Sequence, residues 1–188
     1  MTLYQGYRVE TTRLRGWDYR DPGWYFVTIC TQKHACLLGA ISGLDVTLTP
    51  IGLTASSQLK ALSDHYSNVV VDCSVVMPNH IHAIIVIEGM HAYSPSESVP
   101  VVHRTSPFPA CAPRACSLAS IVRSYKAGLT RWCRDNAYDW FAWQSGFYDR
   151  VLRSNASVNA IRDYIHRNPA NWLFDRDHPR NLATAAET

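Results

Sequence analysis

Two histidines, His80 and His82, stand one residue apart in the stretch HIHAIIVIE, which otherwise has the β-branched composition of a buried strand. Because side chains alternate across a strand, both imidazoles point to one face, opposite a face that carries only Ile and Ala. Their Cα atoms are then about 6–7 Å apart, so both rings can reach one divalent ion. The alternative is a pair of structural histidines whose ring nitrogens are hydrogen-bonded. The pair alone leaves both interpretations open.

The stretch NASVNAIRDYIHRNPANW predicts a helix that ends near Asn168, because the following proline disfavours a helical residue before it. Tyr164 and Asn168 are four residues apart and therefore neighbours on the helix surface. Asn168 lies about 20° from Ile161 on a helical wheel, so it packs inward, where an amide needs a partner. The alternative is that Asn168 caps its own helix and Tyr164 is an ordinary packing residue.

Together these side chains suggest metal-assisted phosphoryl transfer. His80, His82 and the Asn168 amide oxygen can hold Mg²⁺ or Mn²⁺ with coordination positions left open. Such an ion polarises a phosphate, and the Tyr164 phenol beside it can act as the nucleophile on phosphorus. With an ordinary pKa near 10, that phenol needs help to ionise. We expect the ion, and cations such as Arg123 or Lys126, to supply it.

The elements that must position these residues follow from hydrophobic periodicity and turn residues. The two-residue link Pro78-Asn79 predicts a tight hairpin between two β-prone runs. The expected strands span residues 23–32, 68–77, 80–88 and 147–153, and the expected helices lie within residues 47–66, 117–135 and 155–168. This order predicts an α+β fold, a ferredoxin-like βαββαβ antiparallel sheet with helices packed on one face plus a C-terminal tyrosine-bearing helix.

The length of 188 residues predicts one domain across 1–188, with a long loop at about 89–115 and a loose tail from about 176. The sequence lacks an apolar run long enough for a membrane span, and its start lacks a signal-peptide core, so we expect a soluble, cytoplasmic protein without a membrane partner. None of the six cysteines forms a Cys-x-x-Cys pair, which argues against a zinc ribbon and favours reduced thiols.

The net charge of +3 is unevenly distributed. Residues 101–172 carry ten Lys and Arg against four Asp and Glu, whereas residues 1–100 carry six against eight. Arg123, Lys126 and Arg134 fall on one side of their predicted helix, where they can follow a phosphate backbone. This pattern favours a polyanionic partner on that side, and the alternative is a solvated helix face.

Five blocks of the sequence, in order, resemble the REP-associated tyrosine transposases, a family of HUH single-tyrosine transposases. MPNHIHAIIVI resembles the histidine–hydrophobic–histidine motif, and RDYIHRNPANW resembles the tyrosine helix. The other blocks are LRGWDYRDPGWYFVTICTQKHACLLG, IVRSYKAGLTRW and WQSGFYDRVLR. The resemblance runs from about Arg13 to Trp172, nearly the whole chain.

The resemblance implies the HUH ferredoxin-like sheet, with His80 and His82 as ligands of a divalent metal and Asn168 as the third ligand. Tyr164 is then the nucleophile. It cuts single-stranded DNA near a small hairpin and becomes joined to the 5′ phosphate, which leaves a free 3′-hydroxyl. The alternative is a catalytically inactive, domesticated DNA-hairpin-binding protein. The presence of all four residues argues against that alternative.

One block departs from the family. Many relatives carry a histidine within the block that reads FYDRVLR here, at the position of Arg150. Arg150 can contact a phosphate instead. The expected DNA-binding residues are therefore Arg150 and Arg153, together with Arg123, Lys126 and Arg134. Single-tyrosine relatives include monomers and homodimers, and the sequence does not choose between them.

Overall fold

The two β-prone runs on either side of Pro78-Asn79 form the central hairpin of the structure. In this computed structural model, which describes residues 14, 16–43, 45–89 and 117–181, the hairpin pairs β4 (Val69–Val76) with β5 (His80–Ile87). The backbone N–H of Met77 donates to the His80 carbonyl at 2.8 Å and closes the turn. The predicted hairpin is therefore observed, and His80 is the first residue of β5.

Two further strands complete an antiparallel sheet with the order β4-β5-β1-β6. The strand β1 (Gly23–Cys30) pairs with β5 on one side and with β6 (Tyr148–Leu152) on the other. The main helices are α1 (Pro50–Lys60), α3 (Leu118–Asp135) and α4 (Asn155–Arg167). The sequence order β1-α1-β4-β5-α3-β6-α4 confirms the predicted ferredoxin-like layout with an added C-terminal helix.

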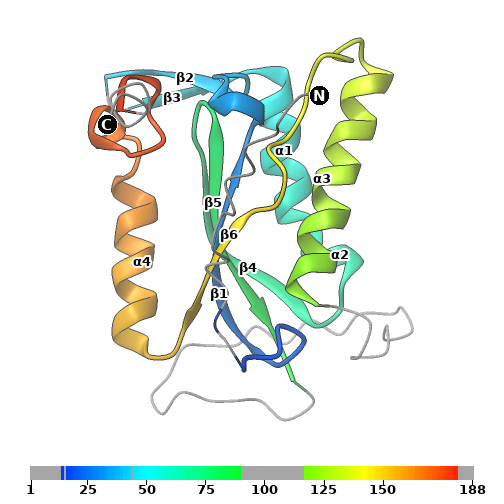
Figure 1. The fold of residues 1–188 in the computed structure, drawn as a ribbon, viewed down its shortest axis with the longest axis vertical. Helices are drawn as coiled ribbons and strands as arrows, with labels where there is room; N and C mark the ends of the chain where they lie inside the picture. The colour runs from blue at the N-terminus through cyan, green and yellow to red at the C-terminus, as the bar shows by residue number, and fades with distance from the viewer. Residues whose placement is uncertain (1–13, 15, 44, 90–116, 182–188) are drawn as a thin grey trace, which may run out of the picture.

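The helices cover the two faces of the sheet unequally (Figure 1). On one face α1 and α3 pack against a large apolar core that includes Ile81, Ala83 and Ile85 of β5. On the other face α4 lies alone, over a smaller cluster built around Ile84 and Ile165. The alternation predicted for β5 is thus observed, because its apolar side faces α1 and α3 while its histidine side faces α4.

Hydroxyl side chains cap all three main helices. Thr49 accepts a hydrogen bond from the Gly52 N–H at the start of α1, and Ser117 accepts one from Ser120 at the start of α3. Ser154 and Ser157 form a reciprocal capping box at the start of α4. The predicted starts of the first two helices at Thr49 and Ser117 are therefore confirmed.

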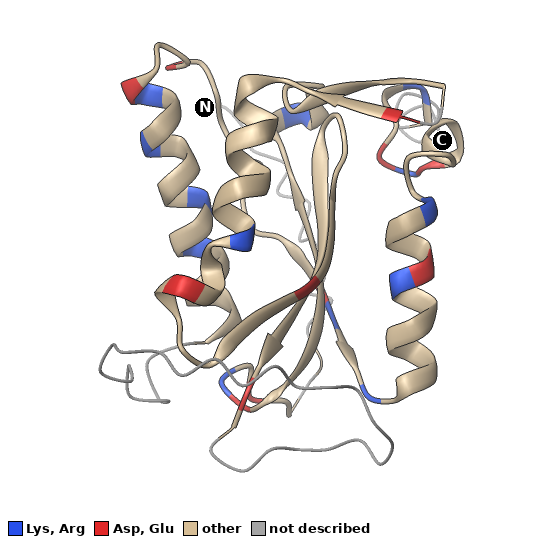
Figure 2. Ribbon diagram, turned by 180° about the vertical axis from the view of Figure 1, so that it is seen from behind, with Lys and Arg blue, Asp and Glu red and all other residues tan. Residues whose placement is uncertain are grey.

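Lys and Arg positions follow both α3 and α4, on opposite sides of the sheet, when the molecule is viewed from behind (Figure 2). On α4, the Arg162 guanidinium is bound by the Asp72 carboxylate of β4, with Nε donating at 2.8 Å. This ion pair is partly buried and fixes the middle of α4 to the edge strand. Among the described helices, none is both long and apolar enough to cross a membrane.

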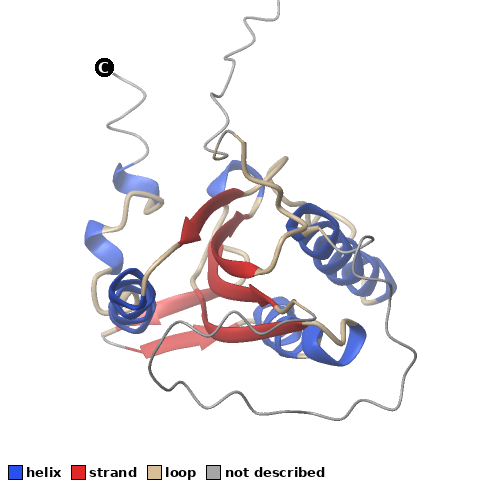
Figure 3. Cartoon of the chain, turned by 90° about the horizontal axis from the view of Figure 1, so that it is seen from below, coloured by secondary structure: helices blue, strands red, loops and turns tan. Residues whose placement is uncertain are grey.

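Several short elements were not predicted. They are the small hairpin of β2 (Gly39–Ser42) and β3 (Asp45–Leu48), and the 3₁₀ turns η1 (Gln32–His34) and η2 (Trp172–Phe174). The single turn α2 (Leu62–His65) lies at the end of the stretch 47–66, where a helix was expected. The view along the sheet shows the layers, with α4 on one side of the strands and α1 and α3 on the other (Figure 3). The long loop predicted at about 89–115 lies almost wholly outside the described residues.

Candidate active site

His80 and His82 lie side by side on the sheet face beneath α4, and they are 0% and 2% exposed. Their ring centroids are 4.4 Å apart, so the two imidazoles converge on one region. Burial lowers the pKa of His80, partly opposed by the nearby carboxylates of Asp175 and Asp177. Burial and the neighbouring His80 hold the pKa of His82 well below its usual value. Both rings are therefore neutral at pH 7, the form that binds a metal.

A neighbouring side chain fixes the orientation of each ring. Asn79 uses its amide nitrogen to donate to two backbone carbonyls, so its Oδ1, 2.8 Å from His80 Nδ1, must accept from that nitrogen. The neutral His80 ring therefore presents the lone pair of Nε2. The Thr28 hydroxyl lies 2.9 Å from His82 Nδ1 and leaves Nε2 of that ring facing α4. Metal-binding histidines typically make such a hydrogen bond through the ring nitrogen that does not bind the metal.

Tyr164 reaches the histidines from α4. Its hydroxyl lies 3.2 Å from His82 Nε2, and the edge of Phe26 packs against its ring with centroids 6.0 Å apart. Burial and the Asp175 carboxylate raise the pKa of the phenol, while contacts with Asn168 and Arg176 oppose that rise. The residue is nevertheless 42% exposed, so part of it remains open to solvent.

Asn168 lies one turn after Tyr164 and is 2% exposed. Its backbone N–H bonds to the Ile165 carbonyl and so helps to end α4, as the capping interpretation expected. Its side chain does more, because Nδ2 donates to Asp175 Oδ2 at 3.1 Å while Oδ1 is buried without a hydrogen bond among the described residues. The predicted inward direction of Asn168 is observed, and its amide oxygen is left available for a ligand.

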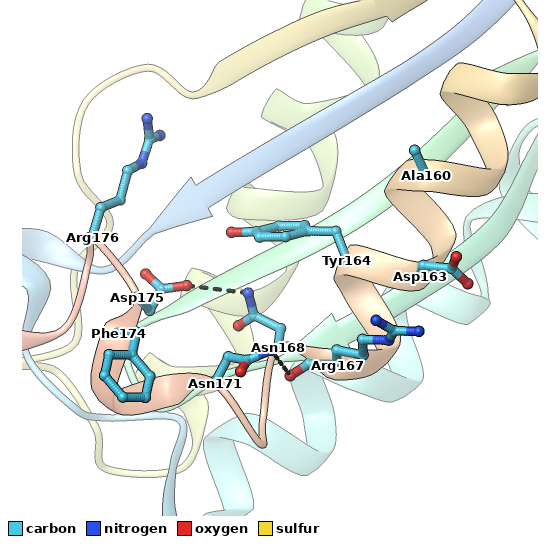
Figure 4. Close-up of a pocket in the computed structure, with 9 residues that line it drawn as sticks. All are labelled: Ala160, Asp163, Tyr164, Arg167, Asn168, Asn171, Phe174, Asp175 and Arg176. Atoms are coloured by element: carbon cyan, nitrogen blue, oxygen red, sulfur yellow. Dashed lines mark hydrogen bonds between the residues drawn. The ribbon is translucent and has the colours of Figure 1, made fainter.

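Asp175 is a site residue that the sequence analysis missed. Figure 4 shows Tyr164, Asn168 and Asp175 directed into the same space, while Asp163 and Arg167 point away from it. The cavity there is open to solvent and has a volume of about 450 Å³. Asp175 follows the proline after the tyrosine helix, where no periodic pattern marks a buried position. The only available signal was the acidic pair in the short stretch DRDH.

The four inward-facing side chains match the donors that a divalent cation needs. Ligand atoms of His80, His82 and Asp175 all lie within 4.8 Å of one another, and Asp175 Oδ2 is 4.0 Å from His80 Nε2. His80 Nε2 and Asn168 Oδ1 are buried atoms without hydrogen bonds in the described part of the chain. Buried polar atoms are rarely left unpaired, so this arrangement fits a bound cation. The donor set of nitrogen and oxygen suits Mg²⁺ or Mn²⁺.

Two of the first residues in the tail predicted from about residue 176 pack against the candidate site. Asp177 and His178 are 5% and 8% exposed, and the His178 ring packs on Trp172 with centroids 4.7 Å apart. Trp172 in turn lies against His80, with ring centroids 5.9 Å apart. The segment after α4 therefore folds back over the histidines and closes one side of the site. Its burial comes from polar and aromatic contacts that a hydrophobic pattern does not reveal.

Comparison with known proteins identifies relatives of the chain and of its fold. No family model matches the chain. An uncharacterized protein of Haemophilus influenzae is 32% identical over 168 residues, which cover 89% of this chain and 91% of that protein. The chain belongs to the same family as this protein.

This chain has the same fold as a solved structure, that of a REP-associated tyrosine transposase bound to a REP hairpin. The TM-score is 0.56, and the match covers 93% of this chain and 87% of the other at 17% sequence identity. This similarity confirms, in the fold, the resemblance to REP-associated tyrosine transposases that the sequence motifs indicated.

The structure separates the expected DNA-binding residues of this family member into two groups. Arg123, Lys126 and Arg134 belong to α3, which covers the other side of the sheet from α4 and Tyr164. Arg150 pairs in register with Phe26 and so lies on the same sheet face as the histidines. Arg153 follows β6, with its guanidinium 5.9 Å from the centre of the Trp17 ring.

The expectation that Arg123 or Lys126 helps Tyr164 to ionise is wrong. Both lie on α3, and the Lys126 ammonium donates to the carbonyls of Gln144 and Gly146 at 2.6 and 2.8 Å. Arg176 is the cation near the phenol, because it lines the cavity with Tyr164 and opposes the rise that burial causes in the pKa of the phenol. Helical periodicity grouped the α3 cations correctly but could not say which face of the sheet α3 covers.

Proposed function

We propose that this protein is a metal-dependent single-tyrosine transposase or endonuclease, which cuts and rejoins single-stranded DNA beside a hairpin through a 5′-phosphotyrosine. The observation that carries the proposal is the position of the Tyr164 hydroxyl, 3.2 Å from His82 Nε2. It lies next to a cluster of two histidines, a carboxylate and an amide, in which His80 Nε2 and Asn168 Oδ1 are buried without partners among the described residues. This combination provides a nucleophile and a cation site on one accessible surface.

The roles of the side chains follow from their positions. His80, His82 and Asp175 would hold the cation, with Asn168 Oδ1 as a further ligand. When bound, Mg²⁺ or Mn²⁺ polarises the scissile phosphate and offsets the charge that develops on it. Asn79 and Thr28 hold the two imidazoles so that their Nε2 atoms face α4. Phe26 and His82 limit the motion of the Tyr164 ring, which orients its hydroxyl for attack.

The covalent step is a direct exchange of phosphate esters. The Tyr164 oxygen loses its proton to solvent, forms a bond to phosphorus, and the bond from phosphorus to the 3′ oxygen breaks. The departing strand takes up a proton and ends in a free 3′-hydroxyl, while the 5′ phosphate stays on Tyr164. Attack by a 3′-hydroxyl reverses the exchange and rejoins DNA. The phosphotyrosine ester replaces the broken ester bond of the DNA and keeps its energy, so no nucleoside triphosphate is required.

A denaturation-resistant adduct tests this proposal. The protein is incubated with Mg²⁺ or Mn²⁺ and an end-labelled single-stranded oligonucleotide that contains a hairpin, including hairpins that flank its own gene. We expect a covalent protein–DNA band that Tyr164→Phe abolishes and that His80→Ala reduces at least about tenfold. Tyr138→Phe is the matched control, because Tyr138 stacks on Trp132 of α3, away from the site, and should leave the band unchanged.

Two results would count against the proposal. A band of normal strength in Tyr164→Phe would show that another residue is the nucleophile. Binding to a hairpin without an adduct, under every metal and DNA condition, would favour a DNA-hairpin-binding protein that has lost its chemistry.

A further inference from the structure

A second cluster of possible metal ligands adjoins the candidate active site. Cys30 ends β1, His34 lies in η1, and Asp177 follows η2, and their ligand atoms all lie within 4.8 Å of one another. Cys30 and Asp177 are 2% and 5% exposed, and His34 is partly buried. None of the three has a role in the proposed DNA reaction. Two segments that are distant in the sequence, residues 30–34 and the turn that holds Asp177, thus bring a thiol, an imidazole and a carboxylate together.

Two atoms of this cluster lack the hydrogen bonds that buried polar groups normally make. His34 Nδ1 and Asp177 Oδ2 are both buried without a hydrogen-bond partner among the described residues. Their contacts are loose ion pairs: His34 Nδ1 lies 3.7 Å from Asp177 Oδ1, and Arg176 Nε lies 3.5 Å from Asp177 Oδ2. A buried carboxylate without hydrogen bonds to that oxygen is costly unless a cation compensates it.

The surrounding structure holds the segments of His34 and Asp177 in place before any ion binds. Asn79 Nδ2 donates to the carbonyls of both His34 and Asp177, at 3.0 and 2.7 Å, and so clamps their two segments together. Lys33 and His34 have φ angles of 55° and 51°, in the left-handed region that non-glycine residues rarely occupy. Backbone strain of this kind persists where surrounding contacts enforce it, and it is frequent at functional sites. At this turn the His34 ring lies beside the Asp177 carboxylate.

We propose that Cys30, His34 and Asp177 form a second metal site, which binds a borderline-soft divalent ion of the zinc class. One sulfur, one nitrogen and one oxygen ligand suit Zn²⁺, whereas the nitrogen and oxygen donors of the first site suit harder ions. Three protein ligands leave one position of a tetrahedral ion for water. Binding converts the Cys30 thiol to a thiolate and releases its proton to solvent.

This second ion would also support the first site. The Asp177 backbone N–H donates to Asp175 Oδ1 at 2.7 Å, and Asn79 joins the Asp177 carbonyl to the His80 ring. Fixing Asp177 therefore helps to fix Asp175 and His80, which belong to the first site. The second site does not depend on the DNA reaction, so each proposal can fail while the other stands.

Cobalt substitution tests the second site directly. Metal-free full-length protein is titrated with Co²⁺, which gives an intense near-ultraviolet charge-transfer band only when a thiolate is a ligand. We expect this band with one equivalent of Co²⁺ and its displacement by Zn²⁺. Cys30→Ser and His34→Gln should reduce it at least tenfold. Cys133→Ser, at another buried cysteine, should not change it, and the double variant His80→Ala/His82→Ala should retain it.

The outcomes separate clearly. Absence of the band in the wild-type protein, or its persistence in Cys30→Ser, would overturn the proposal. Circular dichroism of each metal-free variant checks that the fold is kept. If Cys30→Ser does not fold, His34→Gln decides the question, because its partly exposed side chain can be replaced with less disturbance. Native mass spectrometry after Zn²⁺ addition should then find one zinc fewer in His34→Gln than in the wild type.

Discussion

At the scale of single residues, Asn79 is the side chain on which the site most depends. It is fully buried, yet all its polar atoms are used: Oδ1 accepts from His80, and Nδ2 donates to the carbonyls of His34 and Asp177. One amide thereby sets the tautomer of a proposed metal ligand and ties the segment after α4 to the central hairpin. The sequence pattern presented it only as a turn residue.

We predict that Asn79→Ala lowers the free energy of unfolding by about 2–4 kcal/mol, because it leaves two buried carbonyls and one ring N–H without partners. Urea denaturation followed by circular dichroism measures the change. Asn171→Ala is the matched control, since Asn171 is exposed and makes one hydrogen bond to the Arg167 carbonyl; we expect a loss below about 1 kcal/mol. Equal midpoints for Asn79→Ala and the wild type would refute the role assigned to Asn79.

The residues that sequence analysis could locate are those governed by periodicity. Strand alternation places His80 and His82 together, and the helical wheel turns Asn168 inward. Asp175 could not be located in this way, because it lies in an irregular segment whose position depends on tertiary contacts with Trp172 and the histidines. Short-range patterns describe one strand or one helix at a time. Such patterns therefore locate only some of the residues of a site that is assembled from three or more segments.

At the scale of elements, the approach of α1 to the loop before β2 has a strict steric requirement. A Cβ atom at Gly52, in the first turn of α1, would lie 1.9 Å from the Leu38 carbonyl oxygen. That oxygen also accepts a hydrogen bond from the backbone N–H of Thr49 at 3.0 Å. The helix and the loop therefore touch through their backbones, and only glycine fits between them.

Replacing two helical glycines with alanine should therefore change the free energy of unfolding differently. We predict that Gly52→Ala destabilises the fold by about 2–3 kcal/mol, because the clash outweighs the better helix propensity of alanine. A Cβ at Gly128 of α3 would meet only the flexible end of Gln58, at 3.2 Å, so Gly128→Ala should be neutral or stabilise by up to about 1 kcal/mol. Differential scanning calorimetry gives both values, and similar melting temperatures for the two variants would contradict this explanation.

Element order was predictable here because each main element has a clear start or turn signal, such as Thr49-Pro50, Ser117 or Pro78-Asn79. The small hairpin β2–β3 was missed because its strands have four residues each, too few for alternation to be recognised. The 3₁₀ turns carry no periodic pattern at all. One of them, η1, contributes His34, so part of the second metal cluster was also beyond sequence analysis.

At the scale of the whole molecule, the sheet divides the protein into two sides with different chemistry. The side covered by α1 and α3 contains the main apolar core, and its outer surface carries Arg123 and Arg134. The side covered by α4 contains the proposed active site, with Arg150 and Arg176 on or near that sheet face. On the proposed function, a short single strand of DNA at Tyr164 would contact Arg150 and Arg176 only. A longer DNA with a hairpin could extend toward Arg123 and Arg134.

This separation predicts that DNA length decides which arginines matter. With a short unstructured oligonucleotide, Arg150→Ala/Arg176→Ala should weaken binding, and the slope of log affinity against log salt should fall by about 0.7 for each lost phosphate contact. The double variant Arg123→Ala/Arg134→Ala should leave that binding unchanged and weaken binding only to an oligonucleotide with an added hairpin. Fluorescence anisotropy over a salt series, on catalytically blocked Tyr164→Phe protein, measures both. If both double variants weakened short-strand binding equally, the two sides would not act separately, and the path of DNA over this fold would have to be redrawn around α3.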